Sequence, residues 1–162
     1  MDGFTAFKTT AAEETPKTTA VMDPFHVIRL AGDALDLCRR RVQLELHGTR
    51  GRKHHRLHQA RRTLHTGADL LTDKQQRRLD ELFADDRHVQ VEATWTVYQT
   101  MIAAYRATSR AAGEKTMARL IDSISTAVPT SLVEVCKLGR TLTKRREDIL
   151  AFFDRPGTSN GP

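Results

Sequence analysis

The sequence has few cysteines and no long hydrophobic run. Its two cysteines, Cys38 and Cys136, stand far apart in 162 residues, and neither belongs to a Cys-x-x-Cys pair. We therefore expect two reduced thiols packed as small hydrophobic side chains, without a disulfide. No window approaches the eighteen or so apolar residues of a membrane span, and residues 1–20 lack the apolar core of a secretory signal. These absences predict a cytoplasmic protein with no membrane partner.

The excess of positive charge lies in one part of the sequence. Between Arg39 and Arg62, nine Lys or Arg residues stand against the single acid Glu45, a local balance of +8. The net charge of the whole chain is +6, so the remaining residues carry −2. A basic run with glycines predicts an exposed segment that contacts a phosphate backbone, with binding that salt weakens steeply. The predicted DNA-binding residues are Arg39, Arg40, Arg41, Arg50, Arg52, Lys53, Arg56, Arg61 and Arg62.

Two alternatives remain for this basic run. Its composition is also consistent with a solvated linker that only improves solubility. Its histidines, with His54, His55 and His58 at the centre, would suit an imidazole metal site, although no Cys or acid stands at ligand spacing inside the cluster. If the run does bind nucleic acid, the absence of interleaved aromatic residues favours contact with a duplex backbone over base stacking on a single strand.

One carboxylate, Asp23, stands where a short apolar run meets an amphipathic helix. The segment Thr18–Met22 predicts a short strand, Asp23 suits a helix N-cap, and Pro24 suits the first helical position. A carboxylate at the tip of a strand is also a ligand that metal-dependent phosphoryl-transfer enzymes use. His26 is expected about one helical turn away, where it would orient the carboxylate, approach a phosphate or make a structural hydrogen bond. Capping and catalysis both stay open for Asp23 on this pattern alone.

Three blocks of the sequence resemble the ISL3 family of bacterial insertion-sequence transposases. Residues 21–30, which contain Asp23-Pro24-Phe25-His26-Val27, are similar to the Asp-x-Phe-His-Val block of that family. Residues 138–154 are similar to the helix that returns the family's helical insertion to its catalytic core. Residues 158–162, Thr-Ser-Asn-Gly-Pro, are similar to the family's Thr-Asn-Gly-Pro segment. The resemblance covers essentially the whole chain.

The resemblance implies an RNase H-like fold with an Asp-Asp-Glu triad that binds Mg²⁺ or Mn²⁺ for DNA cleavage and strand transfer. Asp23 takes the position of the second triad carboxylate and is thus the predicted catalytic and metal-binding residue, with His26 near the site. The first triad Asp belongs to an earlier strand and the triad Glu follows the third block, so this chain is expected to be a truncated internal portion. It is expected to bind no metal ion tightly and to cut no DNA alone.

The predicted fold is mainly α. We expect a partial RNase H-like α/β piece, a short strand plus helices, over residues 1–46, and the basic segment over 47–66. An all-helical insertion would follow over 67–155, and a truncated return segment toward the missing Glu over 156–162. A helix that ends before Pro16 is expected near the N-terminus.

Four helices are expected within the insertion. A capping box, Thr72-Asp73-Lys74-Gln75, begins the first. The second, over about 87–108, carries an apolar stripe that favours a core over a base-stacking surface. The third follows Gly113 and ends before Pro129, and the last begins at Gly139 or Arg140 and stops at Pro156. The stripe of the second helix comprises Val91, Trp95, Tyr98, Ile102 and Tyr105.

Two interpretations from other functional classes remain in addition to the transposase interpretation. The chain would also suit a non-enzymatic DNA-binding or regulatory protein that acts through the basic segment and competes with full-length transposase for DNA or for its oligomer interface. It would equally suit a helical interaction module without activity. The expected partners are transposon-end and target DNA, with self-association or a full-length transposase as the protein partner.

Overall fold

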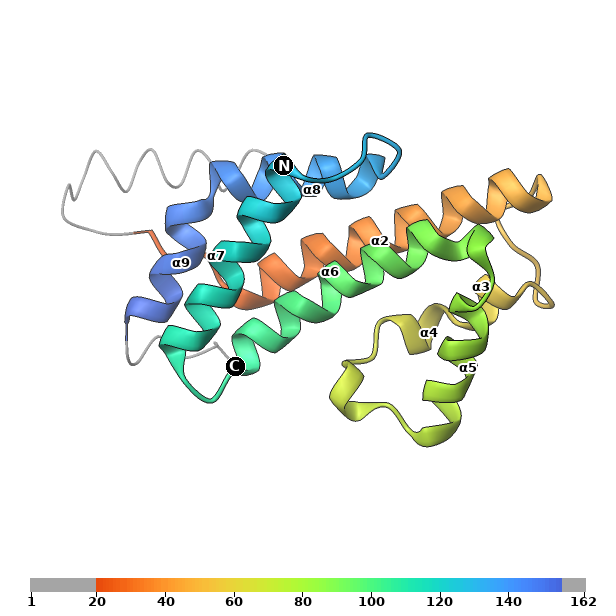
Figure 1. The fold of residues 1–162 in the computed structure, drawn as a ribbon, viewed down its shortest axis with the longest axis horizontal. Helices are drawn as coiled ribbons and strands as arrows, with labels where there is room; N and C mark the ends of the chain where they lie inside the picture. The colour runs from red at the N-terminus through yellow and green to blue at the C-terminus, as the bar shows by residue number, and fades with distance from the viewer. Residues whose placement is uncertain (1–19, 156–162) are drawn as a thin grey trace.

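Two long helices, α2 (Pro24–His47) and α6 (Val89–Arg106), run side by side along the length of the molecule (Figure 1). The computed structural model describes residues 20–155. Three helices pack at one end of this pair, and shorter helical segments lie below its other end (Figure 1). The remaining elements are α3 (Arg56–Gln59), α4 (Arg61–Leu64), η1 (Ala68–Leu70), α5 (Asp73–Phe83), η2 (Asp86–His88), α7 (Arg110–Thr126), α8 (Val133–Lys144) and α9 (Arg146–Asp154).

The mainly helical fold is confirmed, whereas the strand expected over Thr18–Met22 is absent from its described part. Residues 20–22 lie in no helix or strand. A strand needs a neighbour for its backbone groups, and residues 20–155 supply none. Instead, the Met22 N–H donates to the Asp148 carbonyl at 2.9 Å, which ties the entry of α2 to α9.

The ends of the helices follow from their capping residues. The Asp23 carboxylate accepts a hydrogen bond from the Phe25 N–H at 3.0 Å, and Pro24 occupies the first helical position, as expected. Gly48 ends α2 with a φ of 66°, a left-handed conformation that glycine adopts without steric cost. The capping box predicted at Thr72 is confirmed, because Thr72 and Gln75 bond each other's backbone N–H groups.

The apolar stripe of α6 forms part of the core, which confirms the structural interpretation of its aromatic residues. Trp95 packs on Phe83, with ring centroids 5.4 Å apart, and Tyr105 stacks on Phe153 at 5.3 Å. Helix α6 packs against both α2 and α7, and three of the five stripe residues, Val91, Tyr98 and Ile102, are buried. Among the most deeply buried side chains of the core are Val27, Leu35, Leu57, Leu64, Leu79, Leu82, Met101, Met117, Ile121, Leu142 and Ile149.

Two glycines that were interpreted as helix boundaries lie inside helices instead. A Cβ on Gly113 would lie 2.4 Å from the Ala104 carbonyl oxygen, and one on Gly139 would lie 2.6 Å from the Ile124 carbonyl oxygen. These glycines therefore let α7 approach α6 and α8 approach α7. The last helix was also predicted as one element, but it is two, α8 and α9, which separate at Arg145 (φ −111°, ψ 13°).

Several expectations fall beyond the described residues. The N-terminal helix before Pro16 and the third block of the resemblance, residues 158–162, lie outside the range 20–155. None of the helices that the structure describes combines the length and apolar character needed to cross a membrane.

Candidate nucleic-acid interface

Asp23 lies at the exposed N-terminal end of α2 and acts there as the cap. Its carboxylate accepts from the Phe25 N–H, while its carbonyl accepts from the His26 and Val27 N–H groups at 3.0 and 3.2 Å. The His26 side chain is exposed, and its ring meets that of Phe25 edge-on with centroids 6.2 Å apart. The structure therefore brings His26 close to Asp23 in the chain without a hydrogen bond between their side chains.

The surroundings of Asp23 decide whether a divalent metal ion fits there. Mg²⁺ prefers several oxygen ligands in octahedral geometry. Over residues 20–155, no group of three or more His, Cys, Asp or Glu side chains is arranged to hold a metal ion. Asp23 thus has no described partner ligands, and the described residues alone do not fit a two-metal site.

The three consecutive arginines of α2 have different surroundings. Arg39 is buried, and its guanidinium donates to the Asp36 carboxylate at 2.6 and 3.1 Å and also to the Gln43 side chain. The half-exposed Arg40 pairs with the other oxygen of Asp36. Arg41 donates instead to Glu134 on α8. Two of the nine predicted DNA-binding residues, Arg39 and Arg41, therefore make extensive contacts within the protein.

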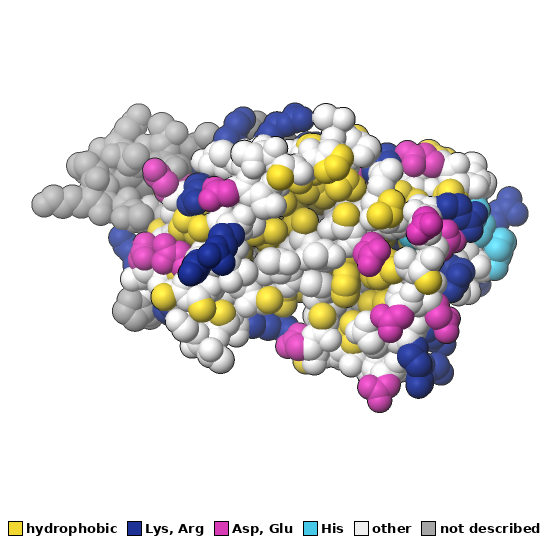
Figure 2. Space-filling view, viewed as in Figure 1, with side chains coloured by type: hydrophobic (Ala, Val, Ile, Leu, Met, Phe, Trp, Pro, Cys, Tyr) yellow, Lys and Arg dark blue, Asp and Glu magenta, His cyan; other side chains and the backbone are white. Residues whose placement is uncertain are grey.

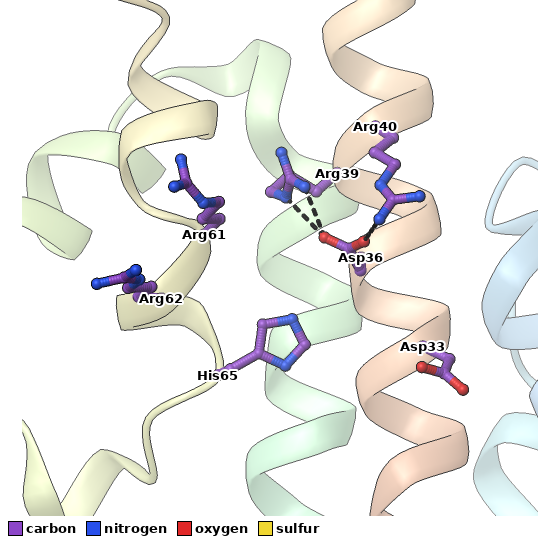
Figure 3. Close-up of a pocket in the computed structure, with 7 residues that line it drawn as sticks. All are labelled: Asp33, Asp36, Arg39, Arg40, Arg61, Arg62 and His65. Atoms are coloured by element: carbon purple, nitrogen blue, oxygen red, sulfur yellow. Dashed lines mark hydrogen bonds and ion pairs between the residues drawn. The ribbon is translucent and has the colours of Figure 1, made fainter. Parts of the chain in front are cut away.

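A hollow of about 510 Å³ lies between α2 and the short helix α4. Figure 3 shows Arg61 and Arg62 of α4 on one side and residues of α2 on the other, with the His65 ring pointing across the gap. The hollow contains four arginines against two aspartates, so it is positively charged overall. Its lining residues are Asp33, Asp36, Arg39, Arg40, Arg61, Arg62 and His65. We call it the arginine cleft.

Contacts to α6 fix the far wall of the arginine cleft. The Tyr98 hydroxyl donates to the His65 carbonyl at 3.1 Å, and Gln99 donates to the Thr66 carbonyl at 2.9 Å. Leu57 and Leu64, both fully buried, anchor α3 and α4 in the core. The second half of the basic segment is thus a folded wall of the cleft.

The loop after α2 carries the remaining predicted cations. The side chains of Arg50, Arg52 and Lys53 are exposed and have no acidic partner within residues 20–155. Arg56 lies 3.9 Å from Glu81 and donates to the Glu81 carbonyl. Figure 2 shows Lys, Arg and His side chains together at the right-hand end of the molecule, where this loop lies.

The histidines of the loop contact one another. The rings of His47 and His55 stack with centroids 4.1 Å apart, and His54 meets His55 edge-on at 4.5 Å. Partial desolvation, followed by the charges of His47 and His54, lowers the pKa of His55. Desolvation and the nearby Arg61 lower the pKa of His58. No metal cluster forms in this described region, so the imidazole metal site finds no support.

Comparison with known families identifies the class of the chain. A family model of ISL3 transposases matches residues 1–162, the whole chain. The chain belongs to the ISL3 family of DDE transposases. No curated protein and no solved structure gives a significant match.

Sequence reasoning missed the acids that organise this interface. Asp36 precedes Arg39 by three residues and Arg40 by four, a spacing that favours ion pairs on a helix and would have been enough to predict these contacts. The pairing of Arg41 with Glu134 spans 93 residues, so no local pattern indicated it.

Proposed function

We propose that this chain is the DNA-contacting helical portion of an ISL3-family transposase and that its basic segment holds the phosphate backbone of duplex DNA. The observation that carries the proposal is the arginine cleft, where α4 sets Arg61 and Arg62 opposite Arg39 and Arg40. Family membership supplies DNA as the class of partner.

Two features of the charged side chains between Arg39 and Arg62 support phosphate binding. Asp36 binds both Arg39 and Arg40, which orients the wall of the cleft and neutralises part of its charge. Arg50, Arg52, Lys53 and Arg62 have no acidic partner among the described residues, so their charges are available to a polyanion. Each such cation that neutralises a phosphate releases a counterion, and salt then weakens binding.

The division of the chain and the role of Asp23 are part of the same proposal. Residues 1–46 belong to an RNase H-like catalytic core, 67–155 to a helical insertion, and 156–162 to the return segment. Asp23 is the carboxylate that this chain contributes to catalysis, and its place at the start of a capped helix fixes its position. Because it is a single carboxylate, the chain alone does not cut DNA.

Salt-dependent binding of a labelled 30-base-pair duplex, followed by fluorescence anisotropy, tests the binding proposal. Replacing Arg50, Arg52 and Lys53 by Gln should reduce the slope of log K against log salt by about 3, at roughly 0.9 per phosphate contact. The matched control replaces Lys74, Arg77 and Arg78, three exposed cations on α5, by Gln. These lie among the acids Asp73, Asp80 and Glu81, and the loss of net charge is the same. Equal slopes for the two variants would reject phosphate contact by the loop, and no duplex binding by the wild-type chain would reject the proposal as a whole.

A plasmid-nicking assay separates this proposal from a self-sufficient nuclease. With Mg²⁺ present, the wild-type chain should leave a supercoiled plasmid intact. Metal-dependent nicking that Asp23→Asn abolishes would contradict the single-carboxylate argument. Tight duplex binding without nicking is also expected of a regulatory DNA-binding protein. Inhibition of a complete transposase by competition for transposon ends would favour that alternative.

A further inference from the structure

Helix α8 carries a second concentration of positive charge, outside the basic segment. Residues 135–146 contain five Lys or Arg residues and no acid. Lys137, Arg140 and Lys144 follow one another at spacings of three and four, so they lie on one face of α8, and all three are exposed. The net charge of −2 outside the basic segment hides this group, because acids elsewhere cancel it in the sum.

The ion pairs of this region leave these three cations uncompensated. Arg145 lies 3.8 Å from the Asp148 carboxylate, and Arg146 lies 3.2 Å from that of Asp122. By contrast, Lys137, Arg140 and Lys144 have no acidic partner within residues 20–155. Their fields therefore add on one face of α8, which distinguishes it from α5, where the acids Asp73, Asp80 and Glu81 flank the cations.

A groove beside α8 shapes part of this face. It has a volume of about 450 Å³, lies between α8 and the end of α7, and includes both Arg140 and Lys144 in its lining. The hydroxyls of Ser125 and Thr126, also in the lining, donate to the Asp122 carbonyl. Their protons are thus committed within α7, and the two cations remain as the donors available to an anionic ligand.

The α8 surface is separate from the loop that follows α2, although Arg41 of the basic run contacts Glu134 at the start of α8. The Arg41–Glu134 contact sets α8 against α2, and the Met22–Asp148 bond shows that α8 and α9 run back toward the start of α2. Lys144 then lies about 15 Å from Glu134 in one direction, and the basic loop begins about 9 Å beyond Arg41 in the other, at 1.5 Å per residue. Figure 2 agrees, with Lys and Arg side chains along the upper edge, apart from those at the right-hand end.

We infer that Lys137, Arg140 and Lys144 form a second phosphate-binding surface for duplex DNA, in addition to the basic segment. The inference rests on the proposed function, because the partner class comes from it. By the same helical rise, the three cations of α8 lie about 14 to 24 Å along α2 from the start of the loop that follows α2. A duplex that reaches both is held at two points, which restricts its orientation as well as its position.

The test compares two triple variants that lose the same net charge. Lys137, Arg140 and Lys144 are replaced by Gln in one, and Lys74, Arg77 and Arg78 of α5 in the other. In duplex anisotropy titrations, the α8 variant should lose about 3 from the salt slope and the α5 variant less than about 1. Circular dichroism and urea midpoints verify that both variants are folded.

The thiol of Cys136 gives a second measurement that needs no substitution, since it lines the α7–α8 groove. Saturating duplex should slow its alkylation in the wild-type chain, and this result decides the question if the α8 variant does not fold. Equal slopes for the α8 and α5 variants, or unchanged Cys136 alkylation, would overturn the α8 surface while leaving the basic segment as a DNA contact. No duplex binding by the wild-type chain would overturn the proposed function and the inference together.

Discussion

The guanidinium of Arg41 on α2 and the carboxylate of Glu134 on α8 meet through two hydrogen bonds, Nε to Oε1 at 2.8 Å and Nη2 to Oε2 at 2.9 Å. The same guanidinium reaches Gln90 on α6 at 2.7 Å. The Glu134 side chain is 10% exposed and that of Arg41 26% exposed, so water screens the pair only partly. One arginine therefore connects three helices.

Replacing Glu134 by Gln should reduce the free energy of unfolding by about 1 to 2 kcal/mol, because a half-buried guanidinium loses its charged partner. Urea unfolding at pH 7 measures the change. The control is Glu45→Gln, since Glu45 also bonds Arg41 but is 55% exposed, and it should cost about 0.5 kcal/mol or less. Equal midpoints for the two variants would show that the Arg41–Glu134 pair makes no special contribution.

The same pair predicts a pH dependence of stability. The hydrogen bonds from Arg41 lower the pKa of Glu134 below its ordinary value of 4.5. A carboxyl group with a lowered folded-state pKa stabilises the fold fully above its unfolded pKa, and loses that effect as pH falls through the folded pKa. The gap between the urea midpoints of wild type and Glu134→Gln should thus be constant near neutral pH, begin to narrow as pH falls below about 4.5, and close only below the lowered folded-state pKa. A gap that widens as pH falls below about 4.5 would contradict this sign.

Two buried helical glycines should respond to alanine with opposite signs. Gly139→Ala puts a Cβ against the Ile124 carbonyl oxygen, so it should destabilise the fold by roughly 2 kcal/mol or more. At Gly32 the nearest atoms, in His65 and Tyr98, would lie 3.5 Å from the new Cβ. Gly32→Ala should therefore stabilise by about 0.5 to 1 kcal/mol through helix propensity. Thermal unfolding of both variants measures this, and stabilisation by Gly139→Ala would show that α7 and α8 pack less closely than described.

Substitutions of Asp23 separate its capping role from its charge. Asp23→Ala removes the acceptor for the Phe25 N–H and should cost about 1 kcal/mol of stability. Asp23→Asn keeps an acceptor and should cost only a few tenths. Urea midpoints of the two variants make the comparison. If Asn destabilises as much as Ala, the negative charge matters to the fold more than the hydrogen bond does.

The two thiols should differ in reactivity. Cys38 is fully buried, and desolvation raises its pKa, whereas Cys136 is half-buried beside a groove. Iodoacetamide should modify Cys136 first and Cys38 only when the chain unfolds, which mass spectrometry of timed samples can follow. Alkylation of native Cys38 at the rate of Cys136 would mean that α2 separates readily from its neighbours.

Local chemistry made several elements predictable. Asp23-Pro24, the box at Thr72 and the apolar stripe of α6 all act within a turn or two of the chain, and each was confirmed. Gly113 and Gly139 were misread because glycine breaks a helix as a matter of local propensity, while here it permits close approach between helices. The strand expected before Asp23 depended on partners from elsewhere in the chain, and no neighbouring strand lies in the described part.

The candidate site likewise combines features that the local sequence indicates with features that depend on contacts between distant residues. The density of arginines between 39 and 62 indicated the interface, yet only the fold turns Arg61 and Arg62 of α4 toward α2. Composition could not separate Arg41 from its neighbours, because its partner Glu134 is distant in sequence. The net charge of the residues outside 39–62 did not reveal the cations of α8, because a sum over many residues hides a cluster of like charges on one face of one helix.

Helix α2 has a geometric consequence for any ligand of the arginine cleft. It is continuous from Pro24 to His47, with Asp23 at its start and Arg39 sixteen residues further on. The rise of an α-helix sets the two about 24 Å apart. A phosphate bound in the cleft beside Arg39 is therefore held at a fixed distance from the Asp23 carboxylate. Inserting or deleting residues in α2 would change that distance in steps of 1.5 Å and rotate the two ends by about 100° each time.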